Sequence, residues 1–219
     1  MKAKTHLSQA KSRGGFTLVE MLVVIGMIAA LAGISFPVYR GIQKKVDRQQ
    51  FIMIMDSIDR AVDNFETEYN YLPHVAAYPG GDASLGNILK DAEVDQFISE
   101  LYGMRTNSNF KAIKFFECQE AKPAGAGYRD GLHDNGNGTV TLYDSSGNPF
   151  YRMAVDYDMD GNIYDPFTWT EPYVTGHKVL IFLPGPDGVI AGADPTGTKP
   201  QNLDNIYNWT TAARPNNGL

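Results

Sequence analysis

One acidic side chain, Glu20, lies within an otherwise apolar stretch near the start of the chain. From Phe16 to Tyr39 it is the single charged residue. A carboxylate just inside an apolar membrane helix costs on the order of a few kcal/mol unless it is paired or lies near the interface. Cleavage before Phe16 would create an α-amino cation one helical turn from Glu20, and this cation could pair with the carboxylate of its own or a neighbouring helix. The alternative is an interfacial residue of an ordinary signal anchor.

Two acidic clusters later in the chain are candidates for a metal site. In the first, Asp156–Asn162, oxygen-bearing side chains at alternate positions precede a glycine, as in the first half of an EF-hand loop. The second half of that pattern is missing, because Phe167 stands where the bidentate glutamate should be. The sequence therefore favours an acidic turn over a calcium site here.

The second acidic cluster lies in the C-terminal tail, residues 184–219, which we expect to be mostly loop. Calcium takes about six to eight oxygen ligands, and backbone carbonyls from a loose loop supply many of them. An ion would anchor a tail of this length, and its candidate ligands are Asp187, Asp194, Asp204 and Asn205. On spacing alone, a calcium site and a solvated acidic tail are equally compatible with these residues.

The chain carries no recognisable catalytic set, so we expect a protein that is not an enzyme. It has no Gly-x-Ser-x-Gly elbow, no phosphate-binding glycine loop with a Lys-Ser/Thr end, and no HExxH pair. Its 4 histidines are scattered. Cys118 is the only cysteine, which excludes an intramolecular disulfide.

Charge and hydropathy divide the chain into three parts. A helix over residues 16–39 would be about 36 Å long at ~1.5 Å per residue, enough for a bilayer core of ~30 Å. The basic residues Lys2, Lys4, Lys11 and Arg13 precede it, which keeps the N-terminus in the cytoplasm and sends the rest outward. We therefore expect a leader at 1–15, a membrane helix at 16–39 and a head domain at 40–219. The net charge of −6 argues against a nucleic-acid partner.

The stretch Gly15–Glu20, with the basic leader before it and Pro37 after it, resembles the N-terminal signature of type IV pilins and of the pseudopilins of type II secretion. The resemblance implies that a prepilin peptidase cuts between Gly15 and Phe16 and methylates the new amine of Phe16. It implies that Glu20 registers each subunit by pairing with a neighbour's N-terminal amine. Pro37 matches a family proline that loosens the helix in the filament.

Two later segments are similar to major pseudopilins in particular. Asp144–Tyr151 is similar to an Asp-Pro-Trp-Gly-Asn-Pro-Tyr segment of that family. Leu183–Gly188 and Asp204–Trp209 are similar to the C-terminal ends of the family, where a loop holds a calcium ion. The resemblance thus implies calcium at the second acidic cluster. This chain has an amide at Asn205 where the family has an acid, and its spacer is longer.

The resemblance implies a structural subunit of a type II secretion pseudopilus. Such a subunit starts in the inner membrane with its head in the periplasm and then polymerises with its own copies and other pseudopilins on an inner-membrane assembly platform. One alternative is a type IV pilus subunit, major or minor, for adhesion, motility or DNA uptake. The alternative of another class is a signal-anchored binding protein of the cell envelope.

Periodicity predicts the elements of the head domain. Apolar residues recur every three or four positions through residues 40–72, which predicts an amphipathic helix that ends near Leu72, before Pro73. A second helix is predicted at Asp91–Leu101, with Asp91 as its N-cap and Gly103 as its stop.

The remaining part of the head domain is predicted to be β-structure and loop. Residues 122–138 are dense in Gly, Asp and Asn and predict an exposed loop. Strands are predicted at Thr139–Tyr143, Pro149–Asp156 and Lys178–Leu183, in one antiparallel sheet. The expected fold is α+β and pilin-like, with the sheet of residues 139–183 packed on the C-terminal half of the long helix.

Overall fold

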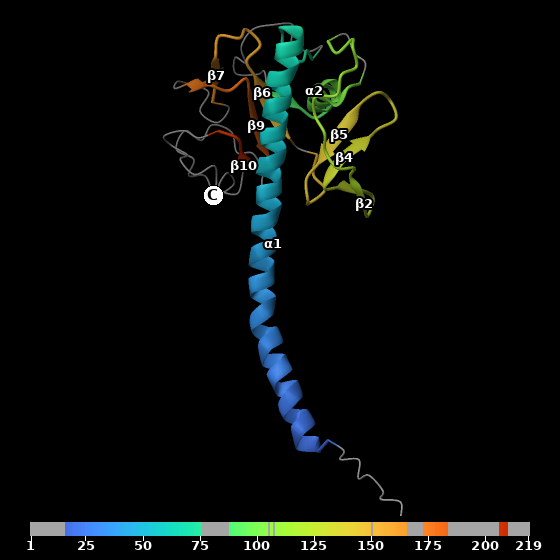
Figure 1. The fold of residues 1–219 in the computed structure, drawn as a ribbon, viewed down its shortest axis with the longest axis vertical. Helices are drawn as coiled ribbons and strands as arrows, with labels where there is room; N and C mark the ends of the chain where they lie inside the picture. Colours follow the sequence, from blue (N-terminus) through green and yellow to red (C-terminus); the bar gives the residue numbers. More distant parts are fainter. Residues whose placement is uncertain are drawn as a thin grey trace, which may run out of the picture. The chain divides into compact units, whose positions relative to one another are not determined.

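The computed structural model describes residues 16–75, 88–104, 106, 108–149, 151–165, 173–183 and 206–209. The chain divides into two compact units, Met1–Val46 and Asp47–Leu219. The first helix, α1 (Leu18–Tyr69), contributes residues to both units (Figure 1). Within α1, the side chains of residues 34–41, 43 and 44 lie outside the description.

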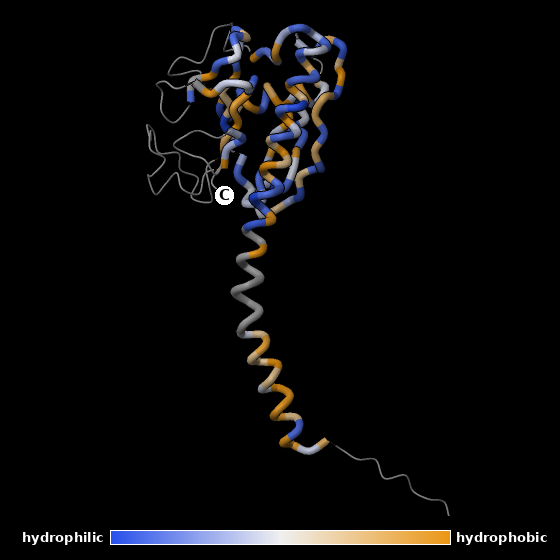
Figure 2. Tube along the Cα trace, turned by 60° about the vertical axis from the view of Figure 1, so that its left-hand side comes forward, coloured by the Kyte–Doolittle hydropathy of each residue, from blue (hydrophilic) through white to orange (hydrophobic). Residues whose placement is uncertain are grey.

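In the first unit, the surface of α1 consists mainly of exposed apolar side chains. Figure 2 colours most of its first turns as hydrophobic. Among the described residues, no helix combines the length and the apolar character that crossing a membrane requires. The membrane-spanning role of residues 16–39 therefore stays a prediction.

In the second unit, α1 forms one wall of the hydrophobic core. Met55, Ile58, Val62 and Phe65 are fully buried, and they follow the spacing of three and four that predicted an amphipathic helix. The helix ends at Tyr69, because the next residue, Asn70, has a φ of 60° and cannot continue it.

The second helix, α2 (Ala92–Tyr102), agrees with its predicted position but not with its predicted N-cap. Asp91 lies at the N-cap position with a φ of 50°, and its side chain makes no capping hydrogen bond. Its carboxylate instead pairs with Arg152 Nη1 at 3.2 Å. The C-terminal prediction is confirmed, because Gly103 has a φ of 96° and its N–H donates to the carbonyl of Glu100 at 3.3 Å.

The main sheet has four strands in the order β1-β6-β9-β10, and every pair is antiparallel. Its strands are β1 (Leu89–Lys90), β6 (Arg152–Val155), β9 (Val179–Leu183) and β10 (Ile206–Tyr207). Strand β9 is buried along its whole length. Met153, Val155 and Ile181 join α1 and α2 in one core cluster. The predicted α+β architecture, with a sheet on the C-terminal half of α1, is confirmed.

Three further strand pairs each form a two-stranded sheet. These are β2 (Lys122–Ala124) with β3 (Gly127–Arg129), β4 (Gly131–Asp134) with β5 (Val140–Tyr143), and β7 (Asn162–Tyr164) with β8 (Tyr173–Thr175). The predicted loop at residues 122–138 is therefore wrong, since it contains three strands. The strand predicted at Thr139–Tyr143 exists as β5, but it pairs with β4 and not with β6.

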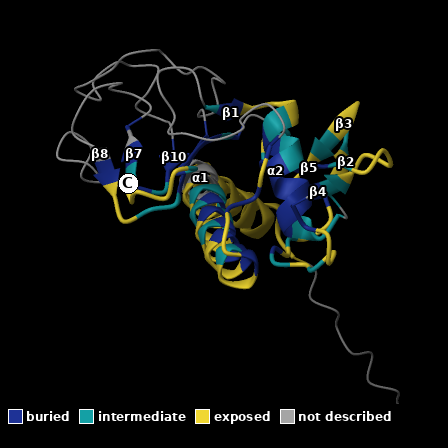
Figure 3. Cartoon of the chain, turned by 90° about the horizontal axis from the view of Figure 1, so that it is seen from above, coloured by how far each residue is buried: buried dark blue, intermediate teal, exposed yellow. Residues whose placement is uncertain are grey.

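The β4–β5 pair packs against α2 rather than joining the main sheet (Figure 3). The N–H of Val140 donates to Ser99 Oγ at 2.8 Å, and the hydroxyl of Thr141 donates to Asp95 Oδ2 at 2.8 Å. At the start of β4, Gly131 has a φ of 147°, and a Cβ there would lie 2.4 Å from the carbonyl oxygen of Gln119. Only glycine fits this position.

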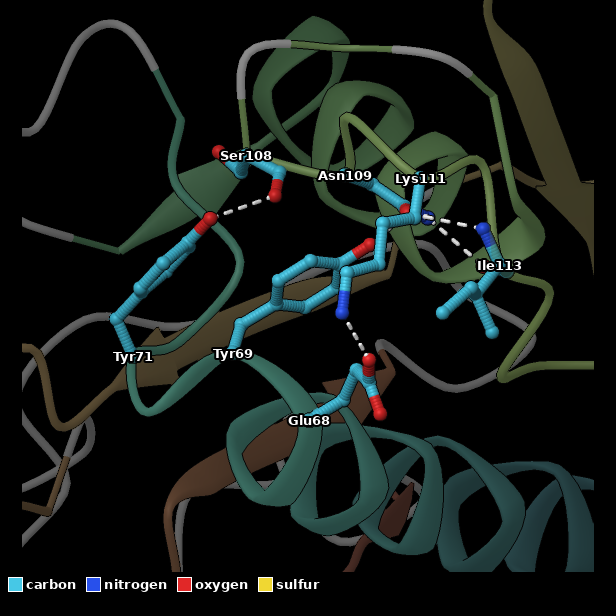
Figure 4. Close-up of polar contacts among 7 residues, drawn as sticks. All are labelled: Glu68, Tyr69, Tyr71, Ser108, Asn109, Lys111 and Ile113. Carbon is cyan, nitrogen blue, oxygen red and sulfur yellow. Dashed lines mark hydrogen bonds and ion pairs between the residues drawn. The ribbon is translucent and has the colours of Figure 1, made fainter.

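A buried amide holds the end of α1 to the loop that follows α2 (Figure 4). Asn109 is fully buried, and its Oδ1 accepts from the hydroxyl of Tyr69 at 2.6 Å and from the N–H of Ile113 at 3.0 Å. Its Nδ2 donates to the carbonyls of Glu100 at 2.7 Å and of Ile113 at 2.8 Å. Lys111 and Glu68 form an exposed ion pair beside it.

We expect Asn109→Ala to destabilise the second unit by about 2–4 kcal/mol, since each buried partner left without a hydrogen bond costs ~1–3 kcal/mol. The affected partners are the Tyr69 hydroxyl and the Glu100 carbonyl. Urea unfolding would measure the change. The matched control is Lys111→Ala, which removes the exposed ion pair with Glu68 and should change the stability far less. Equal losses for the two variants would contradict the proposed role of the amide.

Candidate functional site: the N-terminal end of α1

Thr17 and Glu20 cap the first turn of α1 with reciprocal hydrogen bonds. The N–H of Glu20 donates to Thr17 Oγ1 at 3.2 Å. The N–H and the hydroxyl of Thr17 both donate to Glu20 Oε2, each at 2.8 Å. This is a capping box, in which the side chains at N-cap and N3 satisfy donors that the helix itself leaves free. The carboxylate also lies at the positive end of the helix dipole.

The capping box has a consequence for the charge of Glu20. Hydrogen bonds from Thr17 stabilise the carboxylate, but they bring no positive charge. The side chain is exposed and belongs to none of the ion pairs found among the described residues. It can therefore accept a cation from another molecule without breaking an existing ion pair.

The side chains around Glu20 form an exposed apolar surface on α1. Phe16 is 80% exposed, directly before the capping box. The other large apolar residues of this surface are Leu18, Val19, Met21, Leu22, Val23, Val24, Ile25, Met27, Ile28 and Leu31. A contiguous exposed apolar surface of this kind marks a site of contact with other proteins or with lipid. If this surface is buried against another molecule, the carboxylate of Glu20 needs a positively charged group on that molecule to offset its loss of hydration.

The other predicted site residues are described in part or not at all. Pro37 lies within α1, but its side chain is outside the description. Gly15, Asp187, Asp194, Asp204 and Asn205 lie outside the described residues. The structure therefore does not test the cleavage position or the predicted calcium ligands.

The described part of the C-terminal tail, residues 206–209, is anchored to the main sheet. Ile206 of β10 lies opposite Leu183 of β9 in the antiparallel register. The side chain of Asn208 accepts from the N–H of Ile181 at 2.7 Å and donates to the carbonyl of Val179 at 3.1 Å. Trp209 is buried against Phe182 and Tyr207, with ring centroids 5.9 Å and 5.3 Å away. Leu183 and Ile206, which flank segment 184–205, thus lie side by side in the sheet.

Sequence reasoning missed two of these features. The capping box is readable as Thr17-x-x-Glu20 before an apolar run, a recognised start signal for a helix. Strand β10 has a weaker signal, the apolar residues Ile206, Tyr207 and Trp209 in a tail otherwise rich in Pro, Gly and Asn. A strand of two residues has too little pattern for detection by periodicity.

Comparison with known proteins supports the resemblance of the N-terminal region. Residues 10–36 match the model of the prokaryotic N-terminal methylation motif. The matched range includes Gly15, Phe16, Thr17 and Glu20, and it ends one residue before Pro37. No solved structure matches the chain.

Curated relatives share the first part of the chain. The chain is 36% identical over 59 residues to "Type II secretion system core protein G" of Pectobacterium carotovorum subsp. carotovorum, covering 27% of this chain and 38% of that protein. The protein of the same name in Aeromonas hydrophila is 31% identical over 65 residues, covering 30% and 46%. A "Fimbrial protein" of Neisseria meningitidis serogroup B is 33% identical over 72 residues, covering 33% and 39%.

These matches span less than half of the length of each of these relatives. The similarity to these relatives therefore covers at most 33% of this chain. The N-terminal region thus carries the prokaryotic N-terminal methylation motif and is similar to the corresponding regions of type II secretion core protein G and of a fimbrial protein.

Proposed function

We propose that this chain is a structural, non-enzymatic subunit of a type II secretion pseudopilus. The observation that carries the proposal is the methylation motif at the start of an exposed apolar helix, in the region shared with type II secretion core protein G. An α+β unit with small antiparallel sheets follows that helix, as a pilin-like head requires.

Maturation begins with the leader, residues 1–15. The prepilin peptidase cuts between Gly15 and Phe16 and methylates the amine of Phe16. Residues 16–39 hold the precursor in the inner membrane, with the N-terminus in the cytoplasm and residues 40–219 in the periplasm. The apolar side chains exposed on α1 support this step, since they suit either lipid or the helices of other subunits.

Assembly then exchanges lipid for neighbouring helices. Glu20 pairs with the N-terminal amine of an adjacent subunit, on the assembly platform and together with other pseudopilins. The capping box supports this role, because it holds the carboxylate in a fixed place at the first turn of α1, where Glu20 belongs to no ion pair among the described residues. The contact is heterologous and repeats head to tail, which gives an open filament. Pro37 loosens the helix in that filament.

Calcium in the C-terminal segment is a further part of the proposal. Its ligands would be Asp187, Asp194, Asp204 and Asn205. The pairing of Ile206 with Leu183 supports it, because these two residues flank the segment that carries the ligands and lie opposite each other in the sheet. Because strand pairing already brings the two ends of this segment together, binding an ion there loses less chain entropy than closing a free loop would.

A second candidate function is a type IV pilus subunit, major or minor, favoured by the similarity to the fimbrial protein of N. meningitidis.

Deletion of the gene distinguishes the pseudopilus subunit from the pilus subunit. Export of enzymes into the medium and surface fibres would be scored on the same cells, with and without the gene. Loss of export with unchanged fibres is the result expected for a pseudopilus subunit. Loss of fibres with intact export would overturn it in favour of a pilin. No change in either would favour the third alternative, a signal-anchored binding protein of the envelope.

A further inference from the structure

Three carboxylates converge in the loop between β6 and β7. One ligand oxygen each from Asp156, Asp158 and Asp160 lies within 4.8 Å of the other two. Two oxygens that bind one calcium ion at about 2.3–2.6 Å are at most ~5 Å apart, so this spacing lies within the reach of a single ion. Asp158 and Asp160 are exposed, which gives an ion a path from solvent.

The second observation concerns Asp156 by itself. This residue is only 2% exposed, and its Oδ2 accepts a hydrogen bond from the N–H of Gly161 at 2.9 Å. Its Oδ1 is buried and has no hydrogen-bond partner. A buried carboxylate oxygen without a partner is costly unless a proton or a cation compensates it.

The ion pairs among the described residues do not supply such a cation. None of the ion pairs among the described residues includes Asp156, Asp158 or Asp160. Lys178 lies beside this loop, since its backbone carbonyl accepts from the N–H of Asp156 at 3.0 Å. Its ammonium group is bound to Asp63 and Glu66 of α1.

We infer that Asp156, Asp158 and Asp160 form a calcium site in the β6–β7 loop, separate from the ligands proposed in residues 184–205. An all-oxygen set suits a hard cation, and no His or Cys belongs to the group, which disfavours zinc. The sequence alone favoured an acidic turn here. The buried, unpartnered oxygen of Asp156 favours the calcium site instead, because in a turn exposed to water this oxygen would be hydrogen-bonded to solvent.

The geometry of the loop is fixed without the ion. The N–H of Asp160 donates to Asp158 Oδ1 at 3.2 Å, and the N–H of Asn162 donates to Asp160 Oδ1 at 2.7 Å. Asparagine can accept the same bonds through its side-chain oxygen. The double variant Asp158→Asn/Asp160→Asn therefore keeps the turn and removes two of the negative ligands.

The test uses the full chain in detergent, with Asp187→Asn and Asp204→Asn as a background that removes the other candidate site. Terbium luminescence sensitised by Tyr157, competed by calcium, reports binding. Thermal unfolding with calcium or with a chelator reports stabilisation. The matched control is Asp134→Asn, since Asp134 Oδ1 also accepts a turn hydrogen bond, from the N–H of Gly136 at 2.8 Å.

We expect saturable binding in the background protein and in the Asp134→Asn control. In Asp158→Asn/Asp160→Asn we expect binding at least about tenfold weaker, because calcium affinity follows the number of charged ligands. The same variant should unfold at an equal or higher temperature in chelator, since like charges have been removed, and should lose its shift with calcium. Unchanged binding in the double variant, or no saturable binding in the background protein, would overturn the site. Neither outcome bears on filament assembly, so the proposed function is tested separately.

Discussion

Glu20→Ala is expected to abolish filament assembly while insertion into the membrane and cleavage after Gly15 continue. The carboxylate is the one charge on an apolar helix surface, and loss of a desolvated charge pair costs ~2–5 kcal/mol at each interface. A cost of about 2 kcal/mol alone weakens each contact about thirtyfold, and because it recurs at every subunit we expect no filaments to form. Crosslinking and sedimentation of filaments, with N-terminal sequencing of the subunit, would measure the two steps.

Glu20→Gln separates the capping role of this residue, which the structure shows, from the assembly role that we propose for it. Glutamine at N3 preserves the capping box with Thr17 but carries no charge. Loss of assembly in both variants assigns the effect to the charge. Normal filaments from Glu20→Gln would show that the cap alone matters, and normal filaments from Glu20→Ala would exclude an assembly role. Thr17→Val tests the converse, since it removes the cap and keeps the carboxylate.

Trp209→Ala is expected to destabilise the second unit by about 3–5 kcal/mol, the usual cost of truncating a buried Trp. The side chain is 1% exposed and packs with Phe182 and Tyr207 on the face of the main sheet away from α1's core cluster. A typical domain has about 5–15 kcal/mol of stability, so the variant would lose a large fraction of it. Urea unfolding of the full chain, followed by circular dichroism, would measure the loss.

The control for this variant is Met53→Ala, on an exposed position of α1. Surface substitutions of that kind change stability by about 0.5 kcal/mol or less. Trp209→Phe keeps an aromatic ring and should lose much less than Trp209→Ala. A loss below about 1 kcal/mol for Trp209→Ala would mean that β10 is not held to β9 by this side chain.

The helices were predictable because their pattern is long and one-sided. In α1, the buried residues from Met55 to Phe65 repeat the helical period, and in α2 the residues Val94, Phe97, Ile98 and Leu101 do the same and are all buried. The strands β6 and β9 were predictable from short apolar runs. The capping role of Asp91 was wrong, since Arg152 of β6 pairs with its carboxylate.

The β-hairpins were not predictable from local composition. Residues 122–138 are rich in Gly, Asp and Asn, yet they form β2, β3 and β4, because strand pairing requires backbone hydrogen bonds more than apolar side chains. The partner of β5 was also hidden. Its polar contacts with Ser99 and Asp95 of α2 draw it away from the main sheet, and such contacts depend on tertiary structure.

The opposed positions of Leu183 and Ile206 also bear on how the head domain can be engineered. A chain segment that leaves and re-enters a sheet at neighbouring positions can change in length without shifting the register of the strands that flank it. Each doubling of such a loop costs only ~0.6 kcal/mol of closure entropy. A foreign peptide is therefore best grafted between Asp194 and Asp204, which leaves the proposed calcium ligands in place, and in the proposed filament the graft would be presented once per copy.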